Sequence, residues 1–276
     1  MVKTINLGEV KKGYFKSGEI NTTIEPIKNN SIIILNALLK TADDLVHLMM
    51  TINAINQYNV KAIYLYVPYL PYSRQDRVCN NGEAFSLEVI ADVFNSLNVE
   101  AIYTIDIHNE KSLDLFNNLI SIPFNDICEY NITKDDVHVI PDDGAFKKYH
   151  NSKFTNRFCV FNKVRNPKTR EIVNHTTEYP IANVVNRSCF IMDDICDGGR
   201  TFIGMAKKLK DAGAKKVILI IPHGIFSYGV KCILDSGIDK IVCGDHMLYN
   251  NDEYYLNEKL TKKLHLINTK KLQIKI

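Results

Sequence analysis

Short apolar runs alternate with stretches of helical periodicity along the first half of the chain. Thr41 stands where a helix N-cap is needed, with Asp43 and Asp44 in the first turn that follows. Strand, helix and strand in repetition indicate a parallel sheet with helices on its faces. The apolar runs, which have the length of buried strands, cover residues 32–35, 62–67 and 101–107, and the helical stripes cover 45–55 and 87–97.

The second half repeats this alternation after a looser stretch near residues 123–133. The run 163–185 is polar, and we expect its beginning to form a mobile loop. We predict an α/β fold of two domains, residues 1–128 and 129–250, with a tail, 251–276, that closes back on the first domain. The apolar runs here are 137–140, 157–161, 189–192, 217–221 and 240–243, and a helical stripe covers 202–212.

Composition and charge narrow the class of protein. The chain has 276 residues, 46% of them apolar and 24% charged, which is typical of a globular protein. Its net charge of +3 is small for this length and gives no electrostatic case for nucleic-acid binding. No apolar run approaches the roughly 20 residues that cross a membrane, and the first residues do not resemble a signal peptide.

The seven cysteines are scattered and never spaced as Cys-x-x-Cys. Their odd number and irregular spacing favour reduced thiols in a cytoplasmic compartment. The same pattern argues against a zinc site and against a disulfide framework.

The stretch CFIMDDICDGGRT, residues 189–201, joins a buried strand to a helix through a turn with two glycines. Glycines allow close backbone approach, and free N–H groups at a helix start attract anions, so the turn is suited to phosphate. Asp193, Asp194 and Asp197 then stand at the carboxyl end of the strand, where open α/β sheets bind ligands. The alternative is that Asp197 only caps the helix and that the glycines only make a turn.

Polar groups follow three other predicted strands. Arg74, Gln75, Asp76 and Arg77 lie in the loop after residues 62–67, and arginine forks suit phosphates. The alternative for this loop is an internal Arg–Asp ion pair at the surface.

Asp106 and His108 end the next strand on the same side of its pleat, and Asp142 follows the strand 137–140. His108 and Asp142 are candidate ligands of Mg²⁺. Lys163 and Arg165 open the polar run, where two cations can neutralise charge that develops in phosphoryl transfer. A solvated charge run is the alternative for this pair.

In this order the motifs resemble the ribose-phosphate pyrophosphokinases (phosphoribosyl pyrophosphate synthetases), from about Phe15 to Gly244. The resemblance implies two type I phosphoribosyltransferase-like domains, each a mostly parallel sheet flanked by helices. It also implies that Lys163 and Arg165 are catalytic and that His108 and Asp142 bind metal. Its implied ATP-binding residues are Ser17, Gly18, Glu19, Arg74, Gln75, Asp76 and Arg77, and its implied ribose-phosphate-binding residues are Asp193, Asp194, Asp197, Gly198, Gly199, Arg200 and Thr201.

Two segments depart from the family pattern. The family loop usually reads Asp-Thr-Gly-Gly-Thr, whereas residues 197–201 read Asp-Gly-Gly-Arg-Thr, so a hydroxyl donor is lost and a cation is gained. Ser17 replaces an acid in the Phe-x-Asp-Gly-Glu hairpin, which in the family reaches the nucleotide of a neighbouring subunit. The altered loop leaves open an acceptor larger than ribose 5-phosphate, such as ADP-ribose.

The resemblance implies an enzyme that uses Mg²⁺ and ATP, transfers pyrophosphate to the anomeric hydroxyl of a ribose 5-phosphate unit and releases AMP. It further implies a cytoplasmic homo-oligomer, a dimer or higher, whose partners are small-molecule substrates, with no nucleic acid and no membrane. Two alternatives are a type I phosphoribosyltransferase, which has no need of the Arg-Gln-Asp-Arg and Asp-Ile-His motifs, and a catalytically silent regulatory relative.

Overall fold

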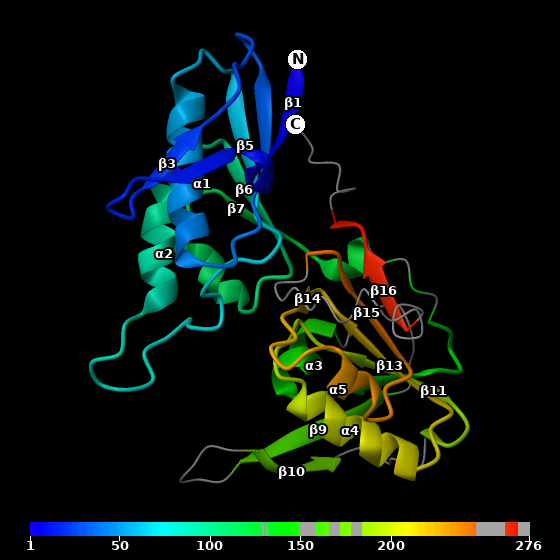
Figure 1. Ribbon diagram of the computed structural model, residues 1–276. Coiled ribbons are helices and arrows are strands. Elements are labelled where there is room, and N and C mark those ends of the chain that lie inside the picture. The colour runs from blue at the N-terminus through cyan, green and yellow to red at the C-terminus, as the bar shows by residue number, and fades with distance from the viewer. Residues whose placement is uncertain are drawn as a thin grey trace. The chain divides into compact units, whose positions relative to one another are not determined.

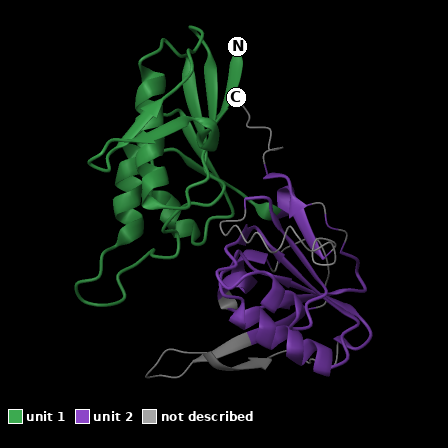
Figure 2. Cartoon of the chain, in the orientation of Figure 1, with its two compact units in different colours: residues 1–124 green, residues 125–276 purple. Residues whose placement is uncertain are grey.

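The computed structural model describes residues 1–128, 130, 132–149, 158–165, 172–177, 184–246 and 263–269. Side chains are described throughout these ranges except at 143, 162–165 and 172–177. The chain divides into two compact units, Met1–Phe124 and Asn125–Ile276 (Figures 1 and 2). In the described residues, no helix is long and apolar enough to cross a membrane. All seven cysteines are free thiols.

The first unit is built on a five-stranded sheet in the order β1-β4-β5-β6-β7, in which every neighbouring pair is parallel. Its helices are α1 (Ala42–Asn56) and α2 (Ser86–Asn95), with 3-10 turns at Leu7–Glu9 and Glu110–Leu115. A further 3-10 turn, Phe124–Asp126, spans the point in the chain where the second unit begins. The expected strands at 32–35, 62–67 and 101–107 are present, while the first and last strands of the sheet were not predicted. The strands are β1 (Val2–Asn6), β4 (Ile32–Asn36), β5 (Ala62–Tyr66), β6 (Ala101–Ile105) and β7 (Leu119–Ile122).

Helix α1 begins where the sequence predicts it. The Asp44 N–H donates to Thr41 Oγ1 at 3.2 Å and the Thr41 N–H donates to Asp44 Oδ2 at 3.0 Å, which completes a capping box. The sequence predicts Leu45, Met49, Ile52 and Ile55 as the buried stripe of this helix. Ile52 and Ile55 are buried, whereas Met49 is 37% exposed and Leu48 is buried.

A hairpin packs against the start of α1 (Figure 1). It consists of β2 (Lys11–Tyr14) and β3 (Ile20–Thr23), which pair antiparallel. The Tyr14 hydroxyl donates to Asp43 at 3.0 Å, and Lys12 pairs with Asp44 at 3.3 Å. The charged first turn of α1 therefore anchors the hairpin as well as capping the helix.

The second unit is built on a seven-stranded sheet in the order β10-β9-β8-β11-β13-β15-β16. All neighbours are parallel except β9 and β10, which form an antiparallel pair at one edge. Its helices are α3 (Asp143–Tyr149), α4 (Arg200–Asp211) and α5 (Lys231–Leu234). The strands are β8 (Val137–Ile140), β9 (Phe158–Arg165), β10 (Ile172–Thr177), β11 (Ser188–Met192), β13 (Lys216–Ile221), β15 (Lys240–Gly244) and β16 (Leu264–Ile267), with a separate short pair, β12 (Ile195–Cys196) and β14 (His223–Gly224).

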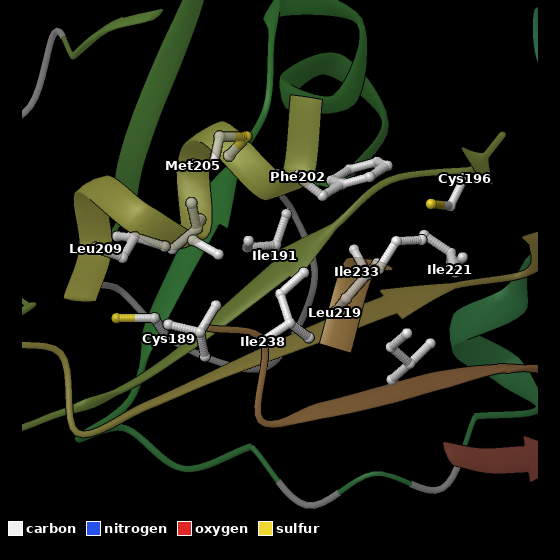
Figure 3. Packing of buried hydrophobic residues seen from close by; sticks show 14 of the residues in the cluster. Cys189, Ile191, Cys196, Phe202, Met205, Leu209, Leu219, Ile221, Ile233 and Ile238 are labelled. Atoms are coloured by element: carbon white, nitrogen blue, oxygen red, sulfur yellow. The ribbon is translucent and has the colours of Figure 1, made fainter. Parts of the chain in front are cut away.

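One apolar cluster joins the central strands of this sheet to α4 and α5. Figure 3 shows its members at close range, with Phe202 of α4, Cys196 of β12 and Ile233 of α5 in the same cluster as the strand residues. All three are at most 4% exposed, so the end of the strand-to-helix turn is held by the core itself. The two mostly parallel sheets flanked by helices confirm the predicted α/β fold.

Three local expectations are corrected. Lys163 and Arg165 do not open a loop, because β9 continues through Arg165 and pairs with His175 and Ile172 of β10. We expected the tail after residue 250 to return to the first domain, whereas its described strand, β16, extends the second sheet beside β15. Leu264 and Ile267 are buried there, which explains the placement. The rest of the tail, 251–262 and 270–276, lies outside the described residues.

The third correction concerns Asp106 and His108. Strand β6 ends at Ile105, and Asp106 has a left-handed backbone with φ of +46°. Asp106 is buried, at 5% exposure, and His108 is exposed. The two side chains therefore do not share one side of a pleat.

Candidate active site

The predicted phosphate turn, residues 193–201 and called the anion turn below, leaves the carboxyl end of β11. The Asp193 N–H donates to the Ile220 carbonyl at 3.3 Å, and the Asp194 N–H donates to Asp193 Oδ1 at 3.0 Å. The chain then forms the short strand β12 before α4 begins at Arg200. The N-cap of α4 is Gly199, so Asp197 is not the capping residue that the alternative interpretation requires.

Both glycines of the anion turn are required by their surroundings. Gly199 has φ of +74°, and a Cβ there would lie 2.7 Å from Ile233 Cγ1. A Cβ on Gly198 would lie 2.9 Å from Cε2 of Tyr228. The backbone therefore comes close to α5 and to the segment before it, and its first helical residue, Arg200, is exposed.

A two-residue parallel pairing ties the anion turn to the end of β13. Strand β12 pairs with β14, with Ile195 opposite His223 and Cys196 opposite Gly224. The His223 N–H donates to the Asp194 carbonyl at 3.1 Å, and the N–H groups of Ile225 and Phe226 both donate to the Cys196 carbonyl, at 2.8 and 3.1 Å. The anion turn thus has its own hydrogen-bonded support, separate from the main sheet.

Asp142 lies at the neighbouring strand end. Strands β8 and β11 are parallel neighbours, so the residues that follow them, Asp142 and Asp193, leave the same edge of the sheet. Asp142 Oδ1 accepts the Ala145 N–H at 3.0 Å at the start of α3. A carboxylate is thereby fixed at a helix N-terminus near the anion turn's side of the sheet.

Strand β9 extends past the carboxyl end of its neighbour β8. It pairs parallel to β8 with Val160 opposite Ile140, the last residue of β8. Lys163 and Arg165 are three and five positions further on, which at about 3.3 Å per residue places their backbones about 10 and 16 Å past that pair. The two predicted catalytic residues thus lie on a β-hairpin at the same edge as the anion turn and Asp142, and their side chains lie outside the description.

In the first unit, the loop after β5 is joined to the segment after β6. The Asn109 Nδ2 group donates to Asp76 Oδ2 at 2.7 Å, and Arg77 pairs with Asp76 at 2.8 Å. An Arg–Asp ion pair of the kind that the alternative interpretation requires therefore exists, between Arg77 and Asp76. Arg74, Gln75 and His108 are thus carried by two segments that hydrogen bonding holds together.

The charge of Asp76 is stabilised where it lies. Burial alone raises the pKa of its carboxyl, but the hydrogen bonds from Arg77 and Asn109 outweigh burial and lower the pKa below its usual value. The ionised carboxylate of Asp76 therefore holds this loop in place through its contacts with Arg77 and Asn109. Asn109 was not predicted from the sequence, since a single asparagine after a strand carries no distinctive signal.

The second group of predicted nucleotide-binding residues forms the tip of the β2–β3 hairpin. Gly18 has φ of +91°, its N–H donates to the Phe15 carbonyl at 2.9 Å, and the Ser17 hydroxyl donates to Glu19 at 2.6 Å. Ser17, Gly18 and Glu19 are exposed. No described contact joins this tip to the Arg74–Arg77 loop.

Behind the anion turn lies a buried pair of histidines, and the sequence did not predict their contact. His223 Nδ1 lies 2.8 Å from His246 Nε2, and the two residues are 3% and 5% exposed. His246 Nδ1 has no hydrogen-bond partner in the described part of the chain. Burial lowers the pKa of His246 to about 4, partly offset by Asp245. His246 is therefore neutral near pH 7, and its Nε2 lies within hydrogen-bond distance of His223 Nδ1.

Comparison with known proteins places these features in a family. Family models match residues 2–97, as the N-terminal domain of ribose phosphate pyrophosphokinase, and residues 164–262, as a phosphoribosyl synthetase-associated domain. A ribose-phosphate pyrophosphokinase of Thermosipho africanus is 30% identical over 261 residues, which cover 89% of this chain and 80% of that protein. The chain belongs to the ribose-phosphate pyrophosphokinase family. It is accordingly an ATP-dependent diphosphotransferase by class.

Further relatives agree with this assignment. The enzyme of the same name from Ralstonia nicotianae is 30% identical over 271 residues, covering 91% of this chain and 83% of its own length. The crystal structure of phosphoribosylpyrophosphate synthetase from Mycobacterium smegmatis matches with a TM-score of 0.74 over 94% of this chain and 85% of that one. At 21% identity, this last likeness bears on the fold alone.

The donor groups suit a magnesium ion held mainly by its substrate. Among the described residues, no group of three or more His, Cys, Asp or Glu side chains forms a metal cluster. Mg²⁺ usually takes one or two carboxylates together with substrate phosphates and water, so Asp142 at a strand end fits this mode. His108 is the less typical ligand, because Mg²⁺ prefers oxygen.

The buried histidine pair predicts an acid-sensitive contribution to stability. The pKa of His246 is lowered from 6.5 to about 4, so between these pH values the unfolded chain binds a proton that the folded chain does not. Stability therefore falls as pH drops through this window, by on the order of 2 kcal/mol between pH 7 and pH 5. Urea unfolding at pH 7, 6 and 5 should show a smaller loss for His246→Gln than for wild type.

The exposed residue His265 supplies the control, since His265→Gln should retain the wild-type loss. Equal losses in wild type and His246→Gln would show that the buried pair does not resist protonation.

Proposed function

We propose that this enzyme transfers the pyrophosphoryl group of ATP to the anomeric hydroxyl of a ribose 5-phosphate unit, with AMP as the leaving group. The observation that carries the proposal is the common sheet edge of the second unit. There, the anion turn, Asp142 and the projecting β9 hairpin follow neighbouring strands. The names of the family's members and the order of the motifs support the same reaction.

The acceptor is held by the anion turn in this proposal. The N–H groups at the start of α4, with Gly198, Gly199 and Thr201, bind the 5-phosphate, because a helix N-terminus and glycine backbone favour an anion. The carboxylates of Asp193, Asp194 and Asp197 accept hydrogen bonds from the ribose hydroxyls. The acceptor is thereby oriented through both ends of the ribose.

In this proposal, ATP is held by residues of the first unit. Arg74 and Gln75 contact the nucleotide, and Asp76 keeps Arg77 and Asn109 in place beside them. Glu19, with Ser17 and Gly18, extends from the hairpin tip toward the nucleotide of a neighbouring subunit, so we further propose a homo-oligomer. Free thiols at all seven cysteines favour a cytoplasmic location.

The reaction joins the anomeric oxygen to the β-phosphorus of ATP and breaks the bond between the β-phosphorus and the α,β-bridging oxygen. The electron pair of that bond leaves with AMP, and the anomeric proton is released. Lys163 and Arg165 stabilise the negative charge that spreads over the transferred phosphates, and positioning supplies much of the remaining acceleration. Asp142 in the second unit and His108 in the first are each proposed ligands of Mg²⁺, which would contribute further charge neutralisation on the phosphates.

A second acceptor is favoured by the composition of the anion turn. Gly198 has no hydroxyl to give to a terminal phosphate, and Arg200 adds an exposed cation at the first position of α4. A phosphate diester carries less charge than a terminal phosphate and continues into further groups. ADP-ribose, whose 5-phosphate is a diester followed by a second phosphate, therefore fits this turn as the larger acceptor.

An acceptor panel tests the proposed function. The protein is incubated with ATP, Mg²⁺ and either ribose 5-phosphate, ADP-ribose or ribose, and AMP and the pyrophosphorylated product are followed by mass. We expect AMP with a phosphorylated acceptor and none with ribose. AMP from ribose 5-phosphate but not from ADP-ribose would contradict the larger acceptor, and no AMP from either phosphorylated acceptor would contradict the reaction.

Replacement of Lys163 tests the mechanism. Lys163→Ala should lower kcat for AMP formation by a factor on the order of 10³, because it removes a cation that acts on transition-state charge. Lys216→Ala is the matched control, since Lys216 is an exposed lysine at the amino end of β13, away from the anion turn's edge. Unchanged turnover of Lys163→Ala would contradict the assigned role, provided that both variants unfold at the wild-type temperature.

A further inference from the structure

The Tyr228 ring and any side chain at position 198 would compete for the same space, which is called the shared site below. A Cβ placed on Gly198 would lie 3.0 Å from Cδ2 of the Tyr228 ring and 2.9 Å from its Cε2, and the second distance is shorter than real Cβ atoms show. The ring therefore fills the space in which a side chain at position 198 would begin. The departure from threonine at 198, noted in the sequence, has this ring as its structural counterpart.

The Tyr228 ring is held against the turn although most of it faces solvent. Phe226 is buried at 1% exposure with φ of +49°, and the Gly229 N–H donates to the Phe226 carbonyl at 2.7 Å, so a tight turn fixes the backbone on either side of Tyr228. The Cys196 carbonyl accepts the N–H groups that tie this segment to the anion turn. Tyr228 itself is 69% exposed. Its ring contributes an open aromatic face rather than a part of the core.

We propose that Tyr228 determines which acceptor the enzyme prefers, by presenting its ring to the group that continues from the acceptor's 5-phosphate. This inference rests on the proposed function. The ring takes the place of a hydroxyl-bearing side chain at position 198 and so withdraws one donor from a terminal phosphate. It supplies in exchange a flat face on which a further sugar or base can stack, as aromatic side chains do for nucleotides. The ligand class is thus a ribose 5-phosphate unit whose phosphate is esterified to a nucleotide-like group.

Arg200 supports the same class of acceptor. It is exposed at the first position of α4, directly after the two glycines of the anion turn. Its guanidinium can pair with a second phosphate in a bidentate way. A single terminal phosphate needs neither this second cation nor an aromatic face.

The test compares kcat/KM for ADP-ribose and for ribose 5-phosphate, by AMP formation, in wild type, Tyr228→Ala and Tyr228→Phe. In Tyr228→Ala we expect the ratio of kcat/KM for ADP-ribose to that for ribose 5-phosphate to fall about tenfold, as when a stacking side chain is removed. Tyr228→Phe keeps the ring and should keep the wild-type ratio within about threefold. A wild-type ratio in Tyr228→Ala, or an equal fall in both variants, would overturn the role of the ring.

A second pair of variants tests the shared site of Tyr228 and Gly198. Gly198→Thr alone should lower kcat/KM for both acceptors, because its side chain meets the ring. Gly198→Thr combined with Tyr228→Ala should recover turnover of ribose 5-phosphate, since the threonine then has space and restores a hydroxyl donor. A double variant no better than Gly198→Thr, with a wild-type unfolding temperature, would contradict the shared site.

Failure of this inference is distinguishable from failure of the proposed function. Absence of AMP from wild type with either acceptor removes the reaction itself. Normal wild-type turnover with acceptor ratios unaffected by Tyr228→Ala removes the specificity role only. A changed oligomeric state of Tyr228→Ala in sedimentation, with an unchanged ratio, would likewise overturn the inference and assign the ring to a subunit contact.

Discussion

The two-residue pairing of β12 with β14 is the constraint on which the second unit's site depends. It fixes the backbone of Ile195 and Cys196 against His223 and Gly224, outside the main sheet and just before α4. The anion turn is also held at both of its ends. Met192, just before it, pairs within the main sheet, and the apolar cluster packs against Gly199 and Phe202 at the other end. Loops positioned by a rigid scaffold are suited to ligand binding, because little ordering remains to be done when the ligand arrives.

This support also explains features that are costly in isolation. His223, one member of the buried histidine pair, and Phe226, a non-glycine residue with positive φ, lie on the segment that carries β14. Each costs free energy unless its surroundings hold it, and here the sheet and the core do so. The same segment places an exposed tyrosine against Gly198. Support of the turn and selection of the acceptor thus fall to one stretch of chain.

Much of the fold follows from the pattern of apolar residues, because the central strands and the amphipathic helices bury continuous stripes. The periodicity correctly located β4, β5, β8, β11, β13 and β15, and the N-cap residue Thr41 correctly located the start of α1. It failed where side-chain burial does not drive the structure. The strand β9 extends through Lys163 and Arg165 because backbone pairing with β10 supports it, and β14 is too short for any periodicity to appear.

The individual site residues were predictable only in part. Carboxylates and glycines after buried strands were visible in sequence, so the anion turn and Asp142 could each be proposed as site residues. The contacts of Asn109 with Asp76 and of Tyr228 with Gly198 join segments far apart in the chain, and they depend on backbone placement that no local pattern encodes. The left-handed backbone of Asp106 changed the expected direction of its side chain for the same reason.

The most direct measurement follows the β-phosphorus of ATP. With ATP isotopically labelled at the β-phosphate, Mg²⁺ and a phosphorylated acceptor, the account predicts that label leaves ATP for the sugar product while unlabelled AMP accumulates in equal amount. Label that remains in a nucleoside diphosphate, with a single phosphate transferred, would contradict attack at the β-phosphorus and with it the proposed reaction.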